Sequence, residues 1–475
     1  MAAAITAPSR KDRVLTDLLI TSSPTAIPVH LCSTSDWDKV KARLPRALQA
    51  FAEASGFSGQ NGRHLVMPDR SGNISAVLLG VEPSDARHRD PFGPGRLSGV
   101  LPAGDYAFRG KLADPAGVAL AWLLNPYRFT LYREQPLPKA RLVCPRGVDQ
   151  AEVVRLAAAV ASSRDLVNTP ANDLGPDEIE AAIRALAADH GAHVAVTLGD
   201  DLLTRGFPMI HAVGRASVRA PRLIDLTWGK PDHPRVTLVG KGVVFDTGGL
   251  NIKPDSAMLL MKKDMGGAAA AIAAARMVMG AKLPVRLRLL VPAVENAIAG
   301  NAFRPGDVLA SRKGLSVEIG NTDAEGRLIL ADALALADED EPAFLADFAT
   351  LTGAARVALG PDLPPFYTHD ERLAADLARL APKVNDPVWR LPLWGPYDNL
   401  LESRIASLNH ISSGAFAGSI TAALFLNRFV SRAASYVHFD IFAWNPSARP
   451  GRPDGGEVQA ARLIYACLKE RYPAP

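Results

Sequence analysis

Four acidic residues near the middle of this 475-residue chain lie next to apolar segments that could bring them together. Asp246 ends one apolar segment, Asp323 and Glu325 follow another, and Asp264 comes just before an Ala-rich stretch. Gathered carboxylates raise one another's pKa unless cations neutralise them. Oxygen ligands suit magnesium, manganese or zinc, and bridging carboxylates can hold two ions for hydrolysis. The residues predict a metal site, with the alternative that Asp323 and Glu325 only stabilise the start of the following helix.

The segments around these residues alternate between strand and helix patterns. Strands are expected at residues 193–198, 235–245, 285–291, 315–319 and 343–348, and helices at residues 153–166, 177–191, 267–280 and 327–337. Continuous apolar strands separated by helices are typical of a mostly parallel sheet covered on both faces. Ligands of such sheets gather at the carboxyl ends of the strands. We therefore expect an α/β fold with the acidic residues at one edge of the sheet.

The length of the chain predicts two or three domains. Up to about residue 145, short apolar runs alternate with Pro/Gly-rich stretches, which indicates a small α/β domain. We place the boundary before the first long helical pattern. A small N-terminal α/β domain then covers residues 1–148, and a larger domain with the central, mostly parallel sheet covered by helices takes up residues 149–475.

Composition and charge limit the classes of partner. The net charge is +4, and the first 150 residues, with 19 basic and 13 acidic side chains, carry +6. These values are too small to indicate nucleic acid or an anionic membrane as the main partner. Three cysteines without C-x-x-C spacing indicate a reducing compartment. We see neither a signal peptide nor an apolar stretch of about 20 residues, so we expect a cytoplasmic protein without a membrane partner.

Several segments resemble the signatures of a known enzyme family. They are residues 239–249 (VGKGVVFDTGG), 262–267 (KKDMGG), 321–327 (NTDAEGR), 168–173 (NTPAND) and 349–354 (ATLTGA). The resemblance is to the leucyl aminopeptidase (cytosol aminopeptidase) family, and it covers about residues 150–445. It implies that residues 149–475 form a metallo-aminopeptidase catalytic domain, which releases N-terminal amino acids, leucine-like but broad, from peptide substrates. It also implies a homohexamer.

The resemblance assigns the metal ligands residue by residue. Lys241, Asp246, Asp264, Asp323 and Glu325 would hold two divalent ions, manganese or zinc. Asp246 and Glu325 would bridge both ions, and Asp323 would hold the more buried one. A lysine donates a lone pair only as a neutral amine, so the resemblance requires that the nearby dications depress the pKa of Lys241.

The resemblance also implies roles for five further residues. Lys253 would contact the scissile carbonyl oxygen and stabilise its developing charge. Arg327 would hold a bicarbonate ion that accepts a proton from water. The backbone of Leu351 and Gly353 would align the substrate, and Met261 would line the side-chain pocket. Without the motifs, Lys241 would be a surface cation, Arg327 a helix residue paired with an acid, and Met261 a plain core residue.

Other functions stay open from the sequence. The same metals could hydrolyse phosphoesters, although that reaction would not need Lys253, Arg327 and the backbone of residues 351–353 together. A catalytically weak relative could act as a DNA-binding protein through the basic first 150 residues. An inactive relative kept for assembly is opposed by the intact set of site residues. The histidines show no H-x-x-x-H pair, and no nucleotide-binding glycine motif is present. Residues 450–458 depart from the family's compact C-terminal turn, so the shape of the side-chain pocket does not carry over.

Overall fold

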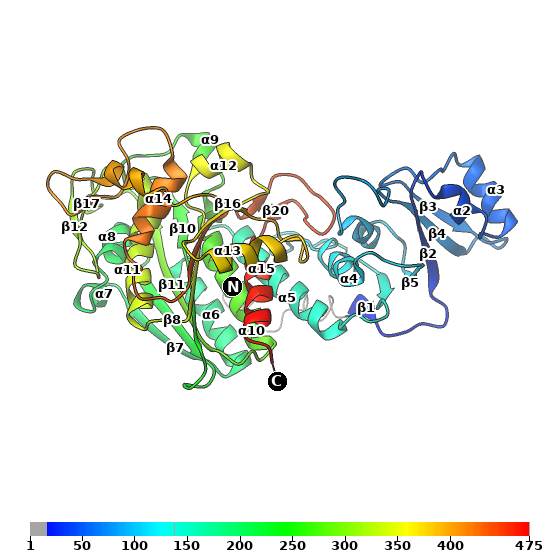
Figure 1. The fold of residues 1–475 in the computed structure, drawn as a ribbon, viewed down its shortest axis with the longest axis horizontal. Coiled ribbons are helices and arrows are strands. Elements are labelled where there is room, and N and C mark those ends of the chain that lie inside the picture. Colours follow the sequence, from blue (N-terminus) through cyan, green and yellow to red (C-terminus); the bar gives the residue numbers. More distant parts are fainter. Residues whose placement is uncertain (1–16, 137, 475) are drawn as a thin grey trace. The chain divides into compact units, whose positions relative to one another are not determined.

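The computed structural model describes residues 17–136 and 138–474, which form two compact units (Figure 1). The smaller unit contains the described residues up to Ala161 together with Ser447–Asp454. The larger unit contains Ser162–Pro446 and the segment from Gly455 onward. The division falls within helix α5 (Gln150–Asn168), later in the chain than the boundary expected between residues 148 and 149. That boundary stays a prediction about where the domains separate.

The smaller unit is an α/β fold, as predicted, built on one six-stranded sheet. Its strands, in spatial order, are β1 (Leu19–Ile20), β6 (Ala140–Val143), β5 (Gly104–Arg109), β2 (Ile27–Cys32), β4 (Ile74–Gly80) and β3 (His64–Pro68). All neighbouring strands are parallel except the antiparallel pair β3 and β4. The helices are α2 (Trp37–Lys41), α3 (Arg46–Ala54), the 3-10 helix η2 (Gly93–Gly99) and α4 (Pro115–Leu124).

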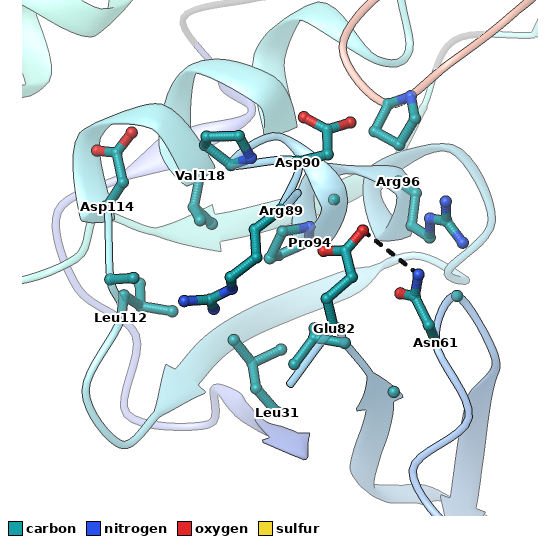
Figure 2. Close-up of a pocket in the computed structure, with 17 residues that line it drawn as sticks. Leu31, Asn61, Glu82, Arg89, Asp90, Pro94, Arg96, Leu112, Asp114 and Val118 are labelled. Atoms are coloured by element: carbon teal, nitrogen blue, oxygen red, sulfur yellow. Dashed lines mark hydrogen bonds between the residues drawn. The ribbon is translucent and has the colours of Figure 1, made fainter. Parts of the chain in front are cut away.

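Helix α4 follows β5 and is almost entirely buried. Asp114 begins the helix, because its side chain accepts a 2.8 Å hydrogen bond from the backbone N–H of Gly117. Mainly apolar residues follow, and all of those from Val118 to Leu124 are buried. A pocket lies beside the start of this helix, at the carboxyl ends of β2 and β4 (Figure 2).

The larger unit is organised around a nine-stranded sheet. Its path runs through β16 (Trp389–Arg390), β15 (Pro365–Tyr367), β18 (Tyr436–Asp440), β14 (Phe344–Ala349), β9 (Arg235–Gly240), β11 (Arg286–Asn296), β8 (Arg222–Trp228) and β7 (His193–Leu198), and β10 (Gly242–Asp246) also pairs with β11. The central strands β18, β14, β9 and β11 are parallel, and β8 and β7 add an antiparallel edge. The expected mostly parallel sheet is confirmed at its centre, where strands buried on both faces need continuous apolar sequence.

Helices cover both faces of this sheet (Figure 1). One face carries α6 (Pro176–His190), α10 (Gly266–Gly280) and α15 (Ala461–Arg471), and the other carries α8 (Pro208–Gly214), α11 (Glu325–Glu339) and α14 (Gly418–Asn427). Further helices are α7 (Asp201–Thr204), α9 (Asp255–Met258), α12 (Gly353–Leu359), α13 (Glu371–Leu380) and the 3-10 helix η5 (Gly395–Leu401).

The segment expected as one strand at residues 235–245 forms two strands, β9 and β10, separated by Lys241. The break lies where α10 packs closely on the sheet. A Cβ at Gly240 would lie only 2.6 Å from the Cα of Ala268, so a residue with a side chain does not fit there. Lys241 itself donates its backbone N–H to Phe348 and accepts from Ala268. The close approach holds the start of β10 next to the helix.

The expected strand at residues 315–319 is the short β13 (Ser316–Glu318), which does not join the main sheet. It lies between β12 (Val308–Ala310) and β17 (Leu408–Asn409) in a separate three-stranded sheet. Only Val317 of β13 is buried, so the strand lacks the two apolar faces that a central parallel strand needs. A last two-stranded sheet pairs β19 (Trp444–Asn445) with β20 (Gly455–Gly456).

Within the described residues, no helix combines the length and the hydropathy needed to cross a bilayer. The three cysteines, Cys32, Cys144 and Cys467, are all free thiols. The expectation that the chain begins without a signal peptide concerns residues before position 17, which lie outside the described part.

Candidate active site

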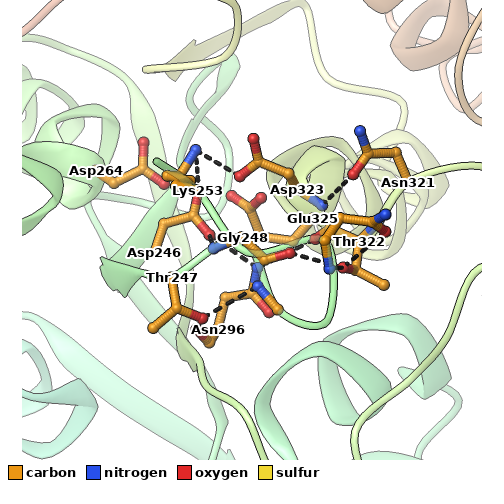
Figure 3. A network of polar contacts seen from close by, with 12 residues as sticks. Asp246, Thr247, Gly248, Lys253, Asp264, Asn296, Asn321, Thr322, Asp323 and Glu325 are labelled. Carbon is orange, nitrogen blue, oxygen red and sulfur yellow. Dashed lines mark hydrogen bonds and ion pairs between the residues drawn. The ribbon is translucent and has the colours of Figure 1, made fainter. Parts of the chain in front are cut away.

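The four acidic residues meet near the carboxyl end of the parallel strands (Figure 3). Asp246 is the last residue of β10, and Asp264 lies in the 3-10 helix η3 (Met261–Met265), which leads directly into α10. Asp323 lies in the 3-10 helix η4 (Thr322–Ala324), and Glu325 is the first residue of α11. Each residue thus sits where a strand or turn passes into the next element, as the sequence predicted.

Lys241 lies buried between the carboxylates of Asp264 and Glu325. Its Nζ is 2.8 Å from Asp264 Oδ2 and 2.9 Å from Glu325 Oε1, and it donates a 2.9 Å hydrogen bond to the carbonyl of Thr350. Burial lowers the pKa of Lys241, but the surrounding carboxylates, Asp264 first, outweigh burial and raise it above its usual value. Lys241 is therefore an ammonium here, and it could serve as a metal ligand only if a cation replaced its proton.

Lys253 lies between the two other carboxylates. Its Nζ is 2.9 Å from Asp246 Oδ2 and 2.5 Å from Asp323 Oδ1, and its side chain is only 13% exposed. Burial lowers its pKa, but the charges of Asp246 and Asp323 raise it above the usual lysine value. Lys253 is thus enclosed in the acidic cluster, and Lys241, which is 3% exposed, is not the surface cation that would be expected without the motifs.

Oxygen atoms of Asp246, Asp323 and Glu325 all lie within 4.8 Å of one another. Burial, together with the charge of Asp246, raises the pKa of Asp323 to about 6 and raises that of Glu325 well above its usual value. For Asp264, burial raises the pKa but Lys241 lowers it further, so the net shift is downward. The cluster as a whole holds more negative charge than its two lysines neutralise.

This donor set fits divalent cations. Glu325 Oε1 and Asp323 Oδ1 are buried and accept no hydrogen bond from the described residues, so their contacts are the ion pairs with Lys241 and Lys253. Each of these buried oxygens thus has a single lysine ammonium as its partner, and a carboxylate oxygen has capacity for a further ligand such as a metal ion. Carboxylate oxygens are also the ligands that manganese and magnesium prefer.

Asn296 holds Asp246 in place, although the sequence analysis did not identify it. Its Nδ2 donates to Asp246 Oδ1 at 2.8 Å and to the carbonyl of Thr322 at 3.1 Å, and the backbone N–H of Gly248 donates to the same carboxylate oxygen at 2.8 Å. Asn296 ends β11, and its register partner in β10 is Asp246. The sequence signal that could have identified Asn296 is its position as a polar residue at the end of an apolar strand.

The 3-10 helix η4 is capped by a residue other than the acids. The side chain of Asn321 accepts a 2.8 Å hydrogen bond from the backbone N–H of Asp323. The side chains of Asp323 and Glu325 face the two lysines, and no side-chain cap is formed at the start of α11. The two acids therefore form no capping hydrogen bond at the start of α11, although Glu325 lies in its first turn.

Arg327 is buried in the first turn of α11 and has no carboxylate within ion-pair distance among the described residues. Its Nη1 donates to the carbonyl of His410 at 2.7 Å, while its Nε is buried and finds no acceptor. Burial lowers the pKa of Arg327 to about 10, although the charge of Glu325 opposes that shift. An unsatisfied guanidinium N–H beside the acidic cluster could bind a small anion.

His410, to which the sequence analysis gave no role, orients this region. Its Nε2 lies 2.9 Å from the carbonyl of Asn321, and its Nδ1 lies 3.2 Å from the backbone N–H of Gly320. Burial, reinforced by Arg327, lowers the pKa of His410 to about 3, so the ring is neutral. A neutral ring can donate to one carbonyl and accept from one N–H, which matches these contacts.

Comparisons with known proteins decide the family. A model of the catalytic domain of the cytosol aminopeptidase family matches residues 161–465, and a model of the M17 aminopeptidase N-terminal domain matches residues 27–145. The chain belongs to the cytosol aminopeptidase family. The family expected from the sequence motifs is confirmed, and the chain is a metal-dependent exopeptidase, a hydrolase.

Individual relatives of this aminopeptidase match it over more than nine tenths of the chain. A probable cytosol aminopeptidase of Geobacter sulfurreducens is 38% identical over 466 residues, 91% of this chain and 93% of the relative. The crystal structure of the cytosol aminopeptidase from Coxiella burnetii has a TM-score of 0.91 and 45% identity, over 96% of this chain and 100% of that one. The bottromycin maturation enzyme BotP in complex with Mn has a TM-score of 0.84 and 32% identity, over 94% and 99% of the two chains.

In this aminopeptidase, the segment expected to align the substrate is held by Asp440, which the sequence analysis missed. The backbone N–H groups of Leu351 and Thr352 donate to Asp440 Oδ1 at 3.2 and 3.3 Å, and Thr352 Oγ1 donates to Oδ2 at 2.6 Å. Gly353 follows as the exposed first residue of α12, and Met261, at the start of η3, is partly exposed. Asp440 ends β18 next to β14, so only the strand order brings it to this segment.

Proposed function

We propose that this aminopeptidase uses two divalent metal ions to release N-terminal amino acids, leucine-like but broad, from peptides. The observation that carries the proposal is the cluster of Asp246, Asp323 and Glu325, whose oxygen atoms lie within 4.8 Å of one another, with Asp246 and Glu325 buried and Asp323 partly exposed. Lys241, Asp246, Asp264, Asp323 and Glu325 would hold the ions. Manganese is favoured, because a related structure contains Mn, and zinc is the alternative.

When bound, the ions would polarise the scissile carbonyl and lower the pKa of water at the site. Ion pairs between residues of the site would then change. Asp246 and Asp323, which now pair with Lys253, would turn to the metals and release the Lys253 ammonium. The freed ammonium could donate to the carbonyl oxygen of the substrate and stabilise the negative charge that develops there.

Arg327 would hold a bicarbonate ion as the proton acceptor. The support is its buried Nε, which has no hydrogen-bond acceptor, and the absence of an ion-pair partner among the described residues. A bicarbonate at this point would satisfy the guanidinium and stand next to the acidic cluster. The described part of the site has no histidine that could act as the base instead, because His410 is buried and turned to backbone groups.

Substrate alignment would come from the backbone of Leu351 and Gly353. Asp440 would fix this segment by accepting the two N–H groups of Leu351 and Thr352. Met261 would line the pocket for the substrate's first side chain. We also propose a homohexamer in the cytoplasm. Neither the described residues nor the relatives' names support the DNA-binding alternative.

The test is hydrolysis of leucine p-nitroanilide and a small dipeptide panel by the full-length protein. Activity should disappear after chelation and return with manganese or zinc, and N-acetylation of the substrate should block it because the free amine is lost. Turnover that is unaffected by complete metal removal, or equal turnover of the N-acetylated substrate, would contradict the proposal. Two bound ions per chain without turnover would contradict the catalytic assignment.

A further inference from the structure

A pocket of about 240 Å³ lies within the smaller unit (Figure 2). It is formed at the carboxyl ends of parallel strands: Leu31 comes from the end of β2, Gly80 ends β4, and Leu112 lies in the loop between β5 and α4. From β2 the chain continues to β3 and β4 on one side of the sheet, and from β5 it continues to β6 on the other. Open α/β sheets bind ligands in the crevice at such a reversal of strand order.

One side of the pocket brings together groups of opposite charge that do not neutralise each other. Asn61 Nδ2 donates weakly to Glu82 Oε1 at 3.4 Å, and the guanidinium of Arg96 lies against the backbone of Gly62, where a Cβ would collide with it. Within the part of the chain that the structure describes, neither Glu82 nor Arg96 forms an ion pair. A negative and a positive group are therefore both available to a ligand next to Asn61.

The other acidic residues of the pocket are already engaged. Asp114 accepts the N–H of Gly117 as the cap of α4, and Asp90 Oδ1 accepts the N–H of Phe92 at 3.0 Å. This leaves Glu82 as the carboxylate with the weakest partner. Because Asn61 offers it only a long hydrogen bond, an ammonium group would be a better partner for Glu82.

The opposite side of the pocket is apolar. Leu31, Leu112 and Val118 line it, and Val118 is buried in the first turns of α4. Figure 2 shows the guanidinium of Arg89 turned toward Leu31 and Leu112, whereas the carboxylate of Glu82 points toward Asn61. The pocket thus has a charged end of both signs and an aliphatic end, with an exposed arginine lying over the latter.

We propose that this pocket binds a free α-amino acid with an aliphatic side chain. Its carboxylate would pair with Arg96, its ammonium with Glu82, and its side chain would contact Leu31, Leu112 and Val118. The volume equals that of about eight liquid waters, which suits a ligand of about nine non-hydrogen atoms. Such amino acids are the products that an aminopeptidase releases, so the smaller unit would sense the product.

The test is calorimetric titration of the metal-loaded, full-length protein with leucine. Two comparison ligands each lack one charge: 4-methylpentanoate has no ammonium, and 3-methylbutylamine has no carboxylate. Loss of a charged hydrogen-bonding partner should weaken binding at least about tenfold. Glu82→Gln and Arg96→Met should each show that loss for leucine, and Arg87→Ala, an exposed arginine outside the pocket lining, should bind as the wild type does.

Two controls accompany this experiment: one distinguishes the pocket from the active site, and the other allows for a variant that does not fold. Inhibition of leucine p-nitroanilide hydrolysis by leucine reports the active site, and it should be unchanged in the Glu82 and Arg96 variants if the proposed catalytic residues act as described. Glu82→Gln conserves shape at a partly exposed position, so it tests the pocket even if Arg96→Met fails to fold.

Three results would overturn the proposal. The first is leucine binding whose affinity is the same in Glu82→Gln, Arg96→Met and the wild type. The second is binding of 4-methylpentanoate as tight as that of leucine, because Glu82 would then have no role. The third is displacement of leucine by inorganic phosphate at equal concentration, which would make the pocket a site for simple anions. Failure of catalysis with intact leucine binding would contradict only the proposed function.

Discussion

Gly326 lies against the side chain of Lys241, so Gly326→Ala tests whether the position of this lysine governs metal binding. A Cβ at residue 326 would lie 2.6 Å from Lys241 Nζ and 2.7 Å from its Cδ, whereas non-bonded atoms rest about 3.5–4.0 Å apart. Lys241 would therefore have to move by about 1 Å, away from its contacts with Asp264 and Glu325.

The size of the effect follows from that displacement. Misplacing an active-site group by about 1 Å can cost about 10²-fold in rate, and disturbing the surroundings of metal ligands costs about 10- to 100-fold in metal affinity. We expect kcat/KM for leucine p-nitroanilide to fall about 100-fold, with less metal retained by elemental analysis after dialysis. The helix itself should tolerate the change, because alanine favours helix over glycine by about 1 kcal/mol.

Two controls separate this mechanism from a general loss of fold. Gly300→Ala adds a Cβ that meets no atom within 4 Å, so this variant should keep its rate and metal content. In Lys241→Ala/Gly326→Ala the target of the clash is gone, so the double variant should be no worse than Lys241→Ala. Full metal and full rate in Gly326→Ala, or losses that add in the double variant, would refute the reasoning.

Glu325→Gln should abolish hydrolysis and metal retention together, whereas Lys253→Ala should lose rate and keep both ions by elemental analysis; metal loss in the Lys253 variant would contradict its role at the carbonyl oxygen. Asp332→Ala should lower the free energy of unfolding in urea by about 3 kcal/mol, because three backbone N–H groups lose their acceptor; unchanged stability would contradict this. Burial raises the pKa of Glu457, but Arg164 lowers it further, to about 2. At pH values above about 4.5, the usual pKa of a glutamate, the ionised Glu457 therefore stabilises the fold by about 3 kcal/mol. This stabilisation is lost as the pH falls toward 2. Glu457→Gln should remove it at pH 7, as measured by urea unfolding across this pH range, and an unaltered pH profile would argue against it.

Local sequence was enough to predict the acidic cluster. The residues that hold the cluster and the neighbouring segment in place could be identified only from the pairing of strands that lie far apart in the chain. Asp246 and Asp323 follow apolar segments directly, so their meeting at a sheet edge could be expected from chain order. Asn296 and Asp440 act through register with neighbouring strands, and no local pattern specifies which strands are neighbours. The roles of Lys241 and Lys253 came from the family motifs alone, because a lysine carries no sequence signal that separates a buried partner from a surface cation.

The same limit explains the difference in strand organisation. Residues 315–319 have an apolar pattern that predicts a strand, and a strand is present as β13. Its membership of a separate sheet depends on pairing with β17, whose residues, Leu408–Asn409, lie about 90 positions later in the chain. Secondary structure was therefore predictable here, while sheet assignment was not.

The smaller unit includes Ser447–Asp454, a segment close to the end of the chain. Gly451 packs against the ring of Phe92, and the guanidinium of Arg452 lies 5.0 Å from the centre of that ring. During synthesis, the N-terminal part of this unit leaves the ribosome long before its last segment exists. The unit that is made first can thus be completed only when nearly the whole polypeptide has been translated, and a fragment cut before α5 would lack the segment that packs against Phe92.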